Sequence, residues 1–258
     1  MPNKPMVPNV AQTFYDRIAS QYDQFYQDWD ETVRSEAQFL QGLFAELGFD
    51  ASARILDCAC GIGTQAIGLA ALGYAVTGSD LSAGELAEAE RRAAERNVSL
   101  RFMQADFRAL SDVFSDSFDI VIAMDNALPH MLTAADLRKA VQSIAGQLRE
   151  GGLFVASIRD YDCMLAEKPA YSAPYVHKTD RGQRVLFQTW DWHGDNYQFI
   201  QYIIDDAENT TVSKFECEYR AVRRAELTAL LRDAGCREVH WRMPEETGFY
   251  QPIVIARK

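Results

Sequence analysis

The sequence has no apolar run that approaches the roughly 20 residues needed for a membrane-spanning helix. Its first ten residues, MPNKPMVPNV, carry prolines and polar residues where a signal peptide would have its apolar stretch. Basic residues are also scarce, since 26 Lys and Arg stand against 37 Asp and Glu, and the net charge is −11. This charge opposes the binding of phosphate backbones. We therefore expect a cytoplasmic protein, with no nucleic-acid or membrane partner, that binds a small or cationic molecule.

Cysteine and histidine are too few and too scattered to indicate a metal site. Of the five cysteines only Cys58 and Cys60 are close in sequence, and the four histidines show no ligand spacing. An odd number of dispersed cysteines is typical of reduced intracellular thiols. Cysteine is among the most buried residue types. We expect both thiols to pack in the core and no metal to be bound.

Helical and strand-like patterns alternate along most of the chain. Apolar spacing predicts two N-terminal helices, 11–23 and 30–47. Short β-rich runs follow at 54–59, 75–80, 100–106, 118–125 and 151–160, and helical stretches lie between them at 64–72, 83–95 and 134–148. This alternation predicts an α/β fold in which helices cover both faces of a parallel sheet.

After residue 162 the alternation stops. Three polar and aromatic-rich runs, 184–194, 197–206 and 211–222, are separated by turn signals such as HGDN and predict a small antiparallel sheet. A helix over 223–236 and strands over 237–243 and 251–258 then close the chain. We expect one domain, 1–258, with an N-terminal helical cap, 1–50, and an inserted β lid, 163–222.

The stretch ILDCACGIGTQ, residues 55–65, places two glycines where a strand turns into a helix. Gly61 and Gly63 allow a ligand to approach the backbone closely. Asp80 follows the second strand, where such folds hold ribose hydroxyls, so the ligand is expected to contain adenosine. GIGTQA also fits an NAD fingerprint, but Asp57 would repel a pyrophosphate and attract an ammonium group. Asp106, after the third strand, is placed to hold an adenine amino group.

The motifs LDCACGIGT, GSDLS and QADF, with the closing pair of strands, resemble those of class I S-adenosylmethionine-dependent methyltransferases. Ala59 stands where the family's first motif has a glycine. The resemblance implies a Rossmann-like seven-stranded, mainly parallel sheet with an antiparallel last strand, and S-adenosylmethionine as the cofactor. The residues expected to bind it are Tyr22, Tyr26, Arg34, Asp57, Ala59, Gly61, Gly63, Asp80, Leu81, Asp106, Phe107 and Met124.

DNALPH, RDYD, the helix DETVRSEAQFL and the inserted lid are similar to those of glycine and sarcosine N-methyltransferases. This likeness implies that Arg34 holds the cofactor carboxylate, Arg159 the carboxylate of an amino-acid substrate, and Asn126 part of the acceptor site. Physical reasoning leaves two readings for Arg159: a buried guanidinium either clamps an anionic ligand or pairs with an internal acid such as Asp162. The likeness also suggests a homo-oligomer.

For the remaining candidate residues, a structural role in packing is the alternative to a functional role. His130 or Tyr161 is the candidate proton acceptor for a substrate amine, although a histidine that opens a helix is as often a capping or core residue. Tyrosines of the helices and the lid are candidates to surround a sulfonium or a cationic substrate, although such aromatics mostly pack. The predicted catalytic residues are Asn126, His130, Arg159 and Tyr161, and the predicted substrate-binding residues are Asn126, Arg159, Tyr161 and Tyr175.

The expected function is transfer of a methyl group to the amine of an amino-acid-like small molecule. Two alternatives stay open at this stage, because a fold does not fix a reaction. The cofactor's own amine can attack its γ-carbon, which gives a cyclic amino acid and methylthioadenosine. The protein can also be a non-catalytic module that binds the nucleotide. In the motif RDYD, Asp160 stands where the similar enzymes have an asparagine. Because of this difference, the motif does not decide which acceptor is methylated.

Overall fold

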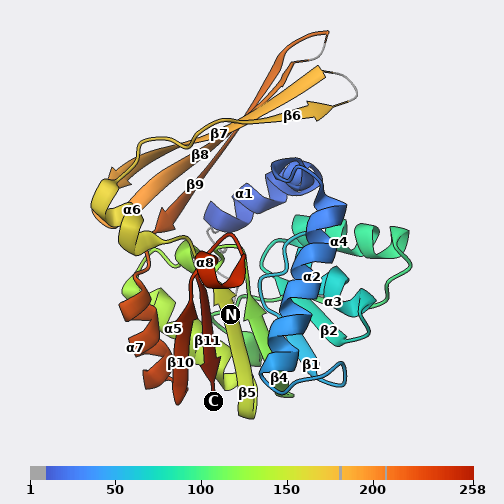
Figure 1. Ribbon diagram of the computed structural model, residues 1–258, viewed down its shortest axis with the longest axis vertical. Coiled ribbons are helices and arrows are strands. Elements are labelled where there is room, and N and C mark those ends of the chain that lie inside the picture. Colours follow the sequence, from blue (N-terminus) through green and yellow to red (C-terminus); the bar gives the residue numbers. More distant parts are fainter. Residues whose placement is uncertain (1–9, 180–181, 207) are drawn as a thin grey trace, which may run out of the picture.

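The computed structural model describes residues 10–179, 182–206 and 208–258 (Figure 1). Its larger sheet has seven strands in the order β10-β11-β5-β4-β1-β2-β3. Neighbouring strands are parallel except at β11, which runs antiparallel to both β5 and β10. This confirms the predicted fold. The strands are β1 (Arg54–Asp57), β2 (Ala75–Asp80), β3 (Arg101–Gln104), β4 (Phe118–Ala123), β5 (Leu148–Ser157), β10 (Glu238–Arg242) and β11 (Ile253–Arg257).

Helices lie on both sides of this sheet (Figure 1). The α-helices of the described chain are α1 (Val10–Ile18), α2 (Trp29–Glu46), α3 (Thr64–Ala71), α4 (Ala83–Glu95), α5 (Ala134–Gly146), α6 (Tyr161–Glu167), α7 (Arg224–Asp233) and α8 (Pro244–Thr247). Three short 3₁₀-helices, Ala19–Phe25, Leu110–Asp112 and Leu128–His130, complete the helical part. Asp28, Ser82 and Thr133 cap α2, α4 and α5 by accepting a backbone N–H, as short polar side chains do at helix starts.

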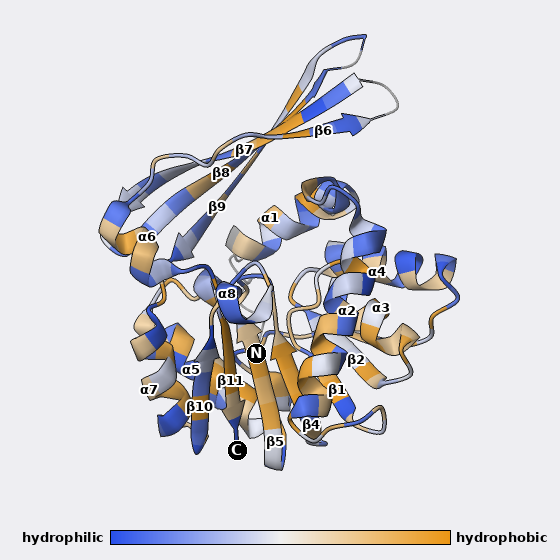
Figure 2. Ribbon diagram, viewed as in Figure 1, coloured by the Kyte–Doolittle hydropathy of each residue, from blue (hydrophilic) through white to orange (hydrophobic). Residues whose placement is uncertain are grey.

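The central strands have apolar, fully buried cores because both of their faces are covered. Ile120, Val121, Ile122 and Ala123 of β4 are all fully buried, as expected for a strand inside a parallel sheet. Figure 2 shows this as orange strands in the middle of the molecule. The strand order reverses between β1 and β4, so the carboxyl ends of these two strands form the crevice where ligands of open α/β sheets bind.

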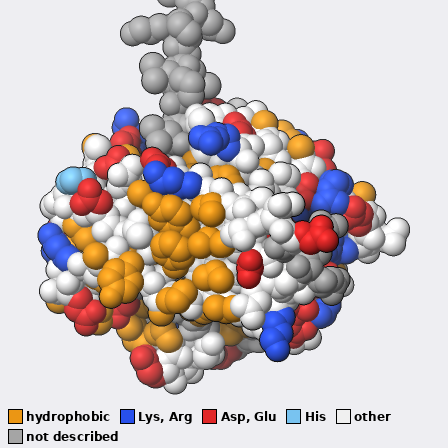
Figure 3. Space-filling view, turned by 90° about the horizontal axis from the view of Figure 1, so that it is seen from above, with side chains coloured by type: hydrophobic (Ala, Val, Ile, Leu, Met, Phe, Trp, Pro, Cys, Tyr) orange, Lys and Arg blue, Asp and Glu red, His pale blue; other side chains and the backbone are white. Residues whose placement is uncertain are grey.

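A second, antiparallel sheet follows α6 and extends above the rest of the molecule (Figure 1). Its strands, in order, are β6 (Tyr175–Thr179), β7 (Gly182–His193), β8 (Asn196–Asp206) and β9 (Thr211–Arg220). The predicted runs match β7, β8 and β9, while β6 and α6 were not predicted. Hydrophobic side chains gather on the face seen from above (Figure 3). The exposed apolar side chains of this region include Tyr171, Tyr175, Val176 and Val212.

Two predicted boundaries were wrong. The helix predicted over 11–23 ends at Ile18 and continues as a 3₁₀-helix, and the helix predicted over 134–148 ends at Gly146 because Leu148 already begins β5. The first nine residues, which include most of the proline-containing start of the predicted cap, lie outside the described residues. No helix in the described ranges is long and apolar enough to cross a membrane.

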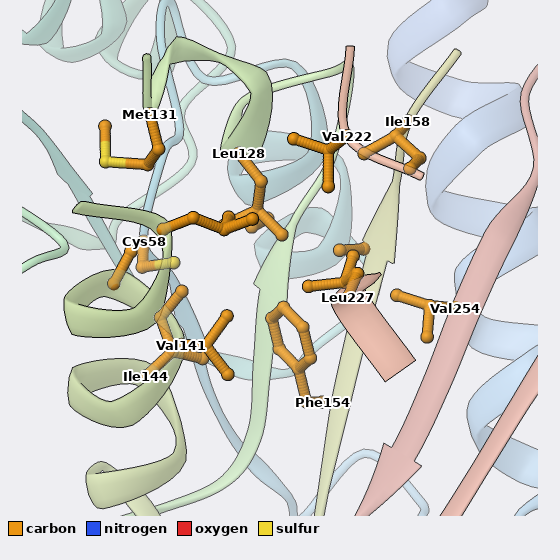
Figure 4. Close-up of a cluster of buried hydrophobic side chains, with 14 of the residues drawn as sticks. Cys58, Leu128, Met131, Val141, Ile144, Phe154, Ile158, Val222, Leu227 and Val254 are labelled. Atoms are coloured by element: carbon orange, nitrogen blue, oxygen red, sulfur yellow. The ribbon is translucent and has the colours of Figure 1, made fainter. Parts of the chain in front are cut away.

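Cys58 and Cys60 are both buried but lie in different hydrophobic clusters. Cys58 is drawn among Leu128, Met131 and Val141 in Figure 4. Burial raises the pKa of both thiols well above the usual value, which keeps them protonated and unreactive. Within the residues that the structure describes, no group of three or more His, Cys, Asp or Glu side chains is arranged to hold a metal ion.

Candidate active site

The glycine turn between β1 and α3 carries the first part of the site. Gly61 and Gly63 have φ values of +51° and +91°, in the left-handed region that a side chain would strain. At Gly63 a Cβ would also stand 2.7 Å from Cδ1 of Ile67, so no side chain fits there. The sequence uses glycine at both positions because the chain must turn tightly and start a helix at once.

Asp80, at the end of β2, is tied to this turn. Its carboxylate accepts hydrogen bonds from the backbone N–H of Gly61 at 3.0 Å and of Ser82 at 2.9 Å. Burial raises the pKa of Asp80, and these backbone donors oppose that shift. Each oxygen keeps a further lone pair for a ligand hydroxyl.

The turn and the carboxyl ends of β2, β3 and β4 line a first cavity, together with residues of α1 and the 3₁₀-helix that follows it. Ten of the predicted site residues line it: Tyr22, Tyr26, Ala59, Gly61, Asp80, Leu81, Asp106, Phe107, Met124 and His130. Its lining includes the carboxyl groups of Asp80, Glu85, Asp106 and Asp125 but, among the described residues, no Lys or Arg. Asp106 is paired with Arg108 at 2.6 Å, and burial raises the pKa values of Asp80, Glu85 and Asp125. The lining offers acidic groups and no basic side chain to a positively charged ligand.

Two predicted cofactor residues lie behind the turn rather than in the cavity lining. Gly63 caps α3, and Asp57 is fully buried at the end of β1. Oδ2 of Asp57 has no hydrogen-bond partner among the described residues, and burial raises the pKa of this carboxyl to about 8. Asp57 therefore contributes a buried acid beneath the turn.

Arg34, which was predicted to hold the cofactor carboxylate, does not line the first cavity in this structure, and that contact stays a prediction. Its side chain is 60% exposed and pairs with Glu31 at 2.7 Å, three residues earlier on α2. Residues two apart on a helix face different directions, and it is Glu36 that is buried on the inner face of α2.

A second cavity lies between the second sheet and the crevice, and it shares Tyr15, Tyr22, Tyr26 and Asp125 with the first one. The two cavities therefore meet at these four side chains. The second cavity is also lined by Asn126, Arg159 and Tyr175, three of the predicted substrate residues. Tyr175 is 67% exposed and lies on β6 at the cavity's outer side.

Arg159 follows β5 and is the only Lys or Arg among the described residues that line either cavity. Its guanidinium donates to Oη of Tyr197 at 3.2 Å and to Oε1 of Gln188 at 3.1 Å, both neutral acceptors. It also lies 5.5 to 5.7 Å from the centres of three aromatic rings, Trp190, Phe199 and Tyr219.

No carboxylate among the described residues forms an ion pair with Arg159. Asp162, the internal partner considered from the sequence, instead pairs with Arg224 at 3.2 Å. A half-buried guanidinium without an anion is costly. The charge is therefore available for an anionic group that enters the second cavity.

Asn126 is buried next to Arg159, with φ at +68°. Its Oδ1 accepts hydrogen bonds from the backbone N–H of Arg159 at 3.1 Å and from Oη of Tyr161 at 3.0 Å. Its Nδ2 has no partner among the described residues, so a donor is left free at the cavity.

Tyr161 is fully buried and lines neither cavity, and its hydroxyl is also hydrogen-bonded to the hydroxyl of Tyr197. Its hydroxyl holds Asn126 in place, and burial raises the pKa of Tyr161, which keeps the phenol protonated. Its role as proton acceptor stays a prediction.

His130 lines the first cavity, and both of its ring nitrogens have a partner. Its Nε2 is 2.8 Å from Oη of Tyr15, and its Nδ1 is 3.7 Å from Sγ of Cys217. Desolvation, with a smaller effect of the Arg159 charge, lowers the pKa of His130 to about 3. Such a weak base does not take a proton from an ammonium at neutral pH. This structure therefore favours His130 as the residue that orients Tyr15.

Sequence reasoning missed four residues at the junction of the cavities: Tyr15, Glu36, Gln65 and Asp125. Tyr15 lies on α1, Glu36 on α2 and Gln65 on α3. Asp125 belongs to the DNALPH motif, which directs attention to this segment, but the other three carry no local signal. They meet because α1, α2 and α3 pack over the same edge of the sheet.

Comparison with known proteins agrees with this geometry. Residues 55–152 match the model of a methyltransferase domain family. Residues of this chain are also 32% identical over 157 positions to a glycine/sarcosine N-methyltransferase of Parasynechococcus marenigrum (strain WH8102). That match covers 61% of this chain and 54% of the relative, so the chain spans about half the length of the curated relatives it matches.

Solved structures share the whole fold. Streptomyces venezuelae DesVI has a TM-score of 0.76 at 22% identity, over 92% of this chain and 97% of its own. SAM-bound CalS10, an amino pentose methyltransferase from Micromonospora echinaspora, has a TM-score of 0.74 at 20% identity, over 99% of both chains. The fold is thus that of S-adenosylmethionine-dependent methyltransferases. The resemblance stated from the sequence, which includes glycine and sarcosine N-methyltransferases, is confirmed.

Proposed function

We propose that this protein transfers a methyl group from S-adenosylmethionine to the amine of a small molecule that also carries an anionic group, such as an amino acid. The observation that carries the proposal is Arg159. Its guanidinium has no carboxylate partner among the described residues, and it lines a cavity that meets the first cavity at four shared side chains. The glycine/sarcosine N-methyltransferases that the chain resembles act on amino acids by name.

The residues of the first cavity fit the cofactor. S-adenosylmethionine supplies, when bound, a methyl group that its sulfonium has already activated. Asp80 would accept from the ribose hydroxyls and Asp106, with Phe107, would lie at the adenine. The lining suits the cationic sulfonium and ammonium groups of this cofactor, because no Lys or Arg of the described chain lines the first cavity.

The chain's own residues then need to bind and orient the acceptor. Arg159 would hold its anionic group in a charge-assisted pair, and the free Nδ2 of Asn126 would donate a second hydrogen bond. The aromatic side chains of the second sheet, Trp190 and Phe199 among them, would exclude water from this end. Correct alignment supplies most of the rate for a group that is already activated.

The first experiment is mass spectrometry of the protein incubated with S-adenosylmethionine, alone and with glycine, sarcosine, other amino acids and amino sugars. Adenosylhomocysteine formed only with an acceptor, and a methylated acceptor, would support the proposal. Methylthioadenosine formed without an acceptor would contradict it. Nothing in the comparisons favours the cyclising enzyme or the non-catalytic module. The cytoplasmic location, the division into cap and lid, and self-association stay predictions.

A further inference from the structure

Asp125 occupies the junction of the two cavities. It follows β4 directly, it lines both cavities, and its φ of +55° is unusual for a residue with a side chain. The backbone N–H of Asp125 donates to Oγ of Ser157 at 2.8 Å, and that hydroxyl donates to Oε1 of Gln251 at 2.9 Å. The strained turn is therefore held from β5 and from the segment before β11, which keeps the carboxyl at the junction.

A second buried carboxyl stands next to Asp125. Nε2 of Gln65 lies 2.8 Å from Oδ2 of Asp125 and 2.6 Å from Oε2 of Glu36, so one amide group bridges the two acids. Oη of Tyr250 donates to the other oxygen of Asp125 at 2.7 Å. Burial, and then the charge of Asp125, raise the pKa of Glu36, and burial raises the pKa of Asp125. Each of the two shifts disfavours the ionised form, so the bridged pair resists carrying two negative charges.

The titratable groups that face Asp125 are all acids or phenols. They are Glu36 of α2, Tyr22 and Tyr26 from the segment after α1, Asp57 of β1 and Tyr250 after α8. An ammonium group that reaches this junction would find anionic and hydrogen-bond acceptors around it. It would not find a competing base, because His130 is a very weak one and Tyr161 lines neither cavity.

We propose that Asp125 is the group that takes the proton from the ammonium of the substrate, and that Glu36, joined through Gln65, is the second carboxyl of this acceptor. The inference rests on the proposed function and deepens it. In the step, an N–H bond of the ammonium breaks, its electron pair stays on nitrogen, and the proton forms an O–H bond on the carboxylate of Asp125. The product is the neutral amine that a methyl transfer needs.

The assignment also fixes how the substrate lies. Its anionic group pairs with Arg159 and its amine points to Asp125, so both ends of a zwitterion are matched within one cavity. The amine then stands where the second cavity meets the first, next to the place proposed for the cofactor.

The test is the pH dependence of kcat/KM for Asp125→Asn, measured with glycine, sarcosine or another acceptor that the wild type methylates. Near neutral pH the variant is expected to lose about 10²-fold or more. The loss should shrink as the pH rises towards the pKa of the amine, because the neutral amine then forms without a base.

Tyr250→Phe removes a hydrogen bond that lowers the pKa of Asp125, so the acidic limb of the pH profile of this variant should move to higher pH. Glu90→Gln, an exposed acid of α4, should leave the profile unchanged.

A second measurement does not depend on turnover. Infrared spectra of the protein without cofactor should show carbonyl bands of protonated carboxyls at neutral pH, with Asp57 as one source, and Glu36→Gln or Asp125→Asn should remove or shift one of these bands. A wild-type spectrum that neither substitution changes in this region would overturn the inference.

The outcomes separate the two proposals. A wild type that methylates no amine would contradict the proposed function, and this inference with it. A wild type that turns over while Asp125→Asn shows a loss that does not depend on pH would overturn the inference alone. A weaker affinity of Asp125→Asn for S-adenosylmethionine, measured by calorimetry, with an unchanged pH profile would assign Asp125 to the cofactor instead.

Discussion

Arg159 gives the sharpest prediction for substrate recognition. Replacement by methionine keeps an unbranched chain to pack against Trp190, Phe199 and Tyr219 but removes the charge. A hydrogen bond to a charged group contributes roughly 1.5–3 kcal/mol. At about 1.4 kcal/mol for each factor of ten, kcat/KM for a carboxylate acceptor should fall about 10- to 140-fold in Arg159→Met.

The assay compares an acid with its uncharged analogue, for example glycine with glycinamide, in the wild type and in Arg159→Met. The wild type should prefer the acid, and the variant should lose most of that preference. Affinity for S-adenosylmethionine should not change, since Arg159 does not line the first cavity. Equal losses for acid and amide would refute a carboxylate clamp, and an unfolded variant, detected by circular dichroism, would show that the aromatic packing needs the guanidinium.

The remaining predictions concern the first cavity and the core. Asp80→Asn should weaken S-adenosylmethionine binding by roughly 1.5–3 kcal/mol, the value of a charged acceptor, and an unchanged affinity in calorimetry would remove Asp80 from the ribose site. Replacement of Cys58 and Cys60 by alanine should cost roughly 1 kcal/mol of stability for each cavity and leave turnover largely intact; loss of turnover in a folded variant would disprove a packing role. His130 has a folded pKa of about 3, below its unfolded value of 6.5, so the unfolded state gains the proton first and the wild type loses stability as the pH falls from 6.5 towards 3. The free energy of unfolding, measured with urea at pH 7 and at pH 5, should fall less between these pH values for His130→Gln than for the wild type. Equal falls in the two proteins would contradict the pKa shift.

The fold was largely readable from the sequence because its signals are local and repeated. Each buried strand is a short apolar run, and each is followed by a helical pattern or a turn. β6 escaped prediction because most of its residues are exposed and no alternation of apolar and polar residues marks it. α6 escaped because it has only seven residues and lies directly after a strand.

The sequence named more residues of the first cavity than of the second for the same reason. Gly61, Asp80 and Asp106 each follow a strand, so spacing alone places them at one edge of the sheet. Arg34 lies outside the lining of both cavities because the phase of α2 turns Glu36 inwards instead. Tyr250 reaches Asp125 from 125 residues away, a contact that no local pattern indicates.

The central claim is that a methyl group moves to an amine held between Arg159 and Asp125. The most direct measurement supplies S-adenosylmethionine with a carbon-13 label in its methyl group and follows the label by NMR and mass spectrometry with an amino-acid acceptor present. The account predicts the label on the nitrogen of the acceptor, with adenosylhomocysteine formed in equal amount. Label retained in methylthioadenosine, or found on carbon or oxygen of the acceptor, would contradict it.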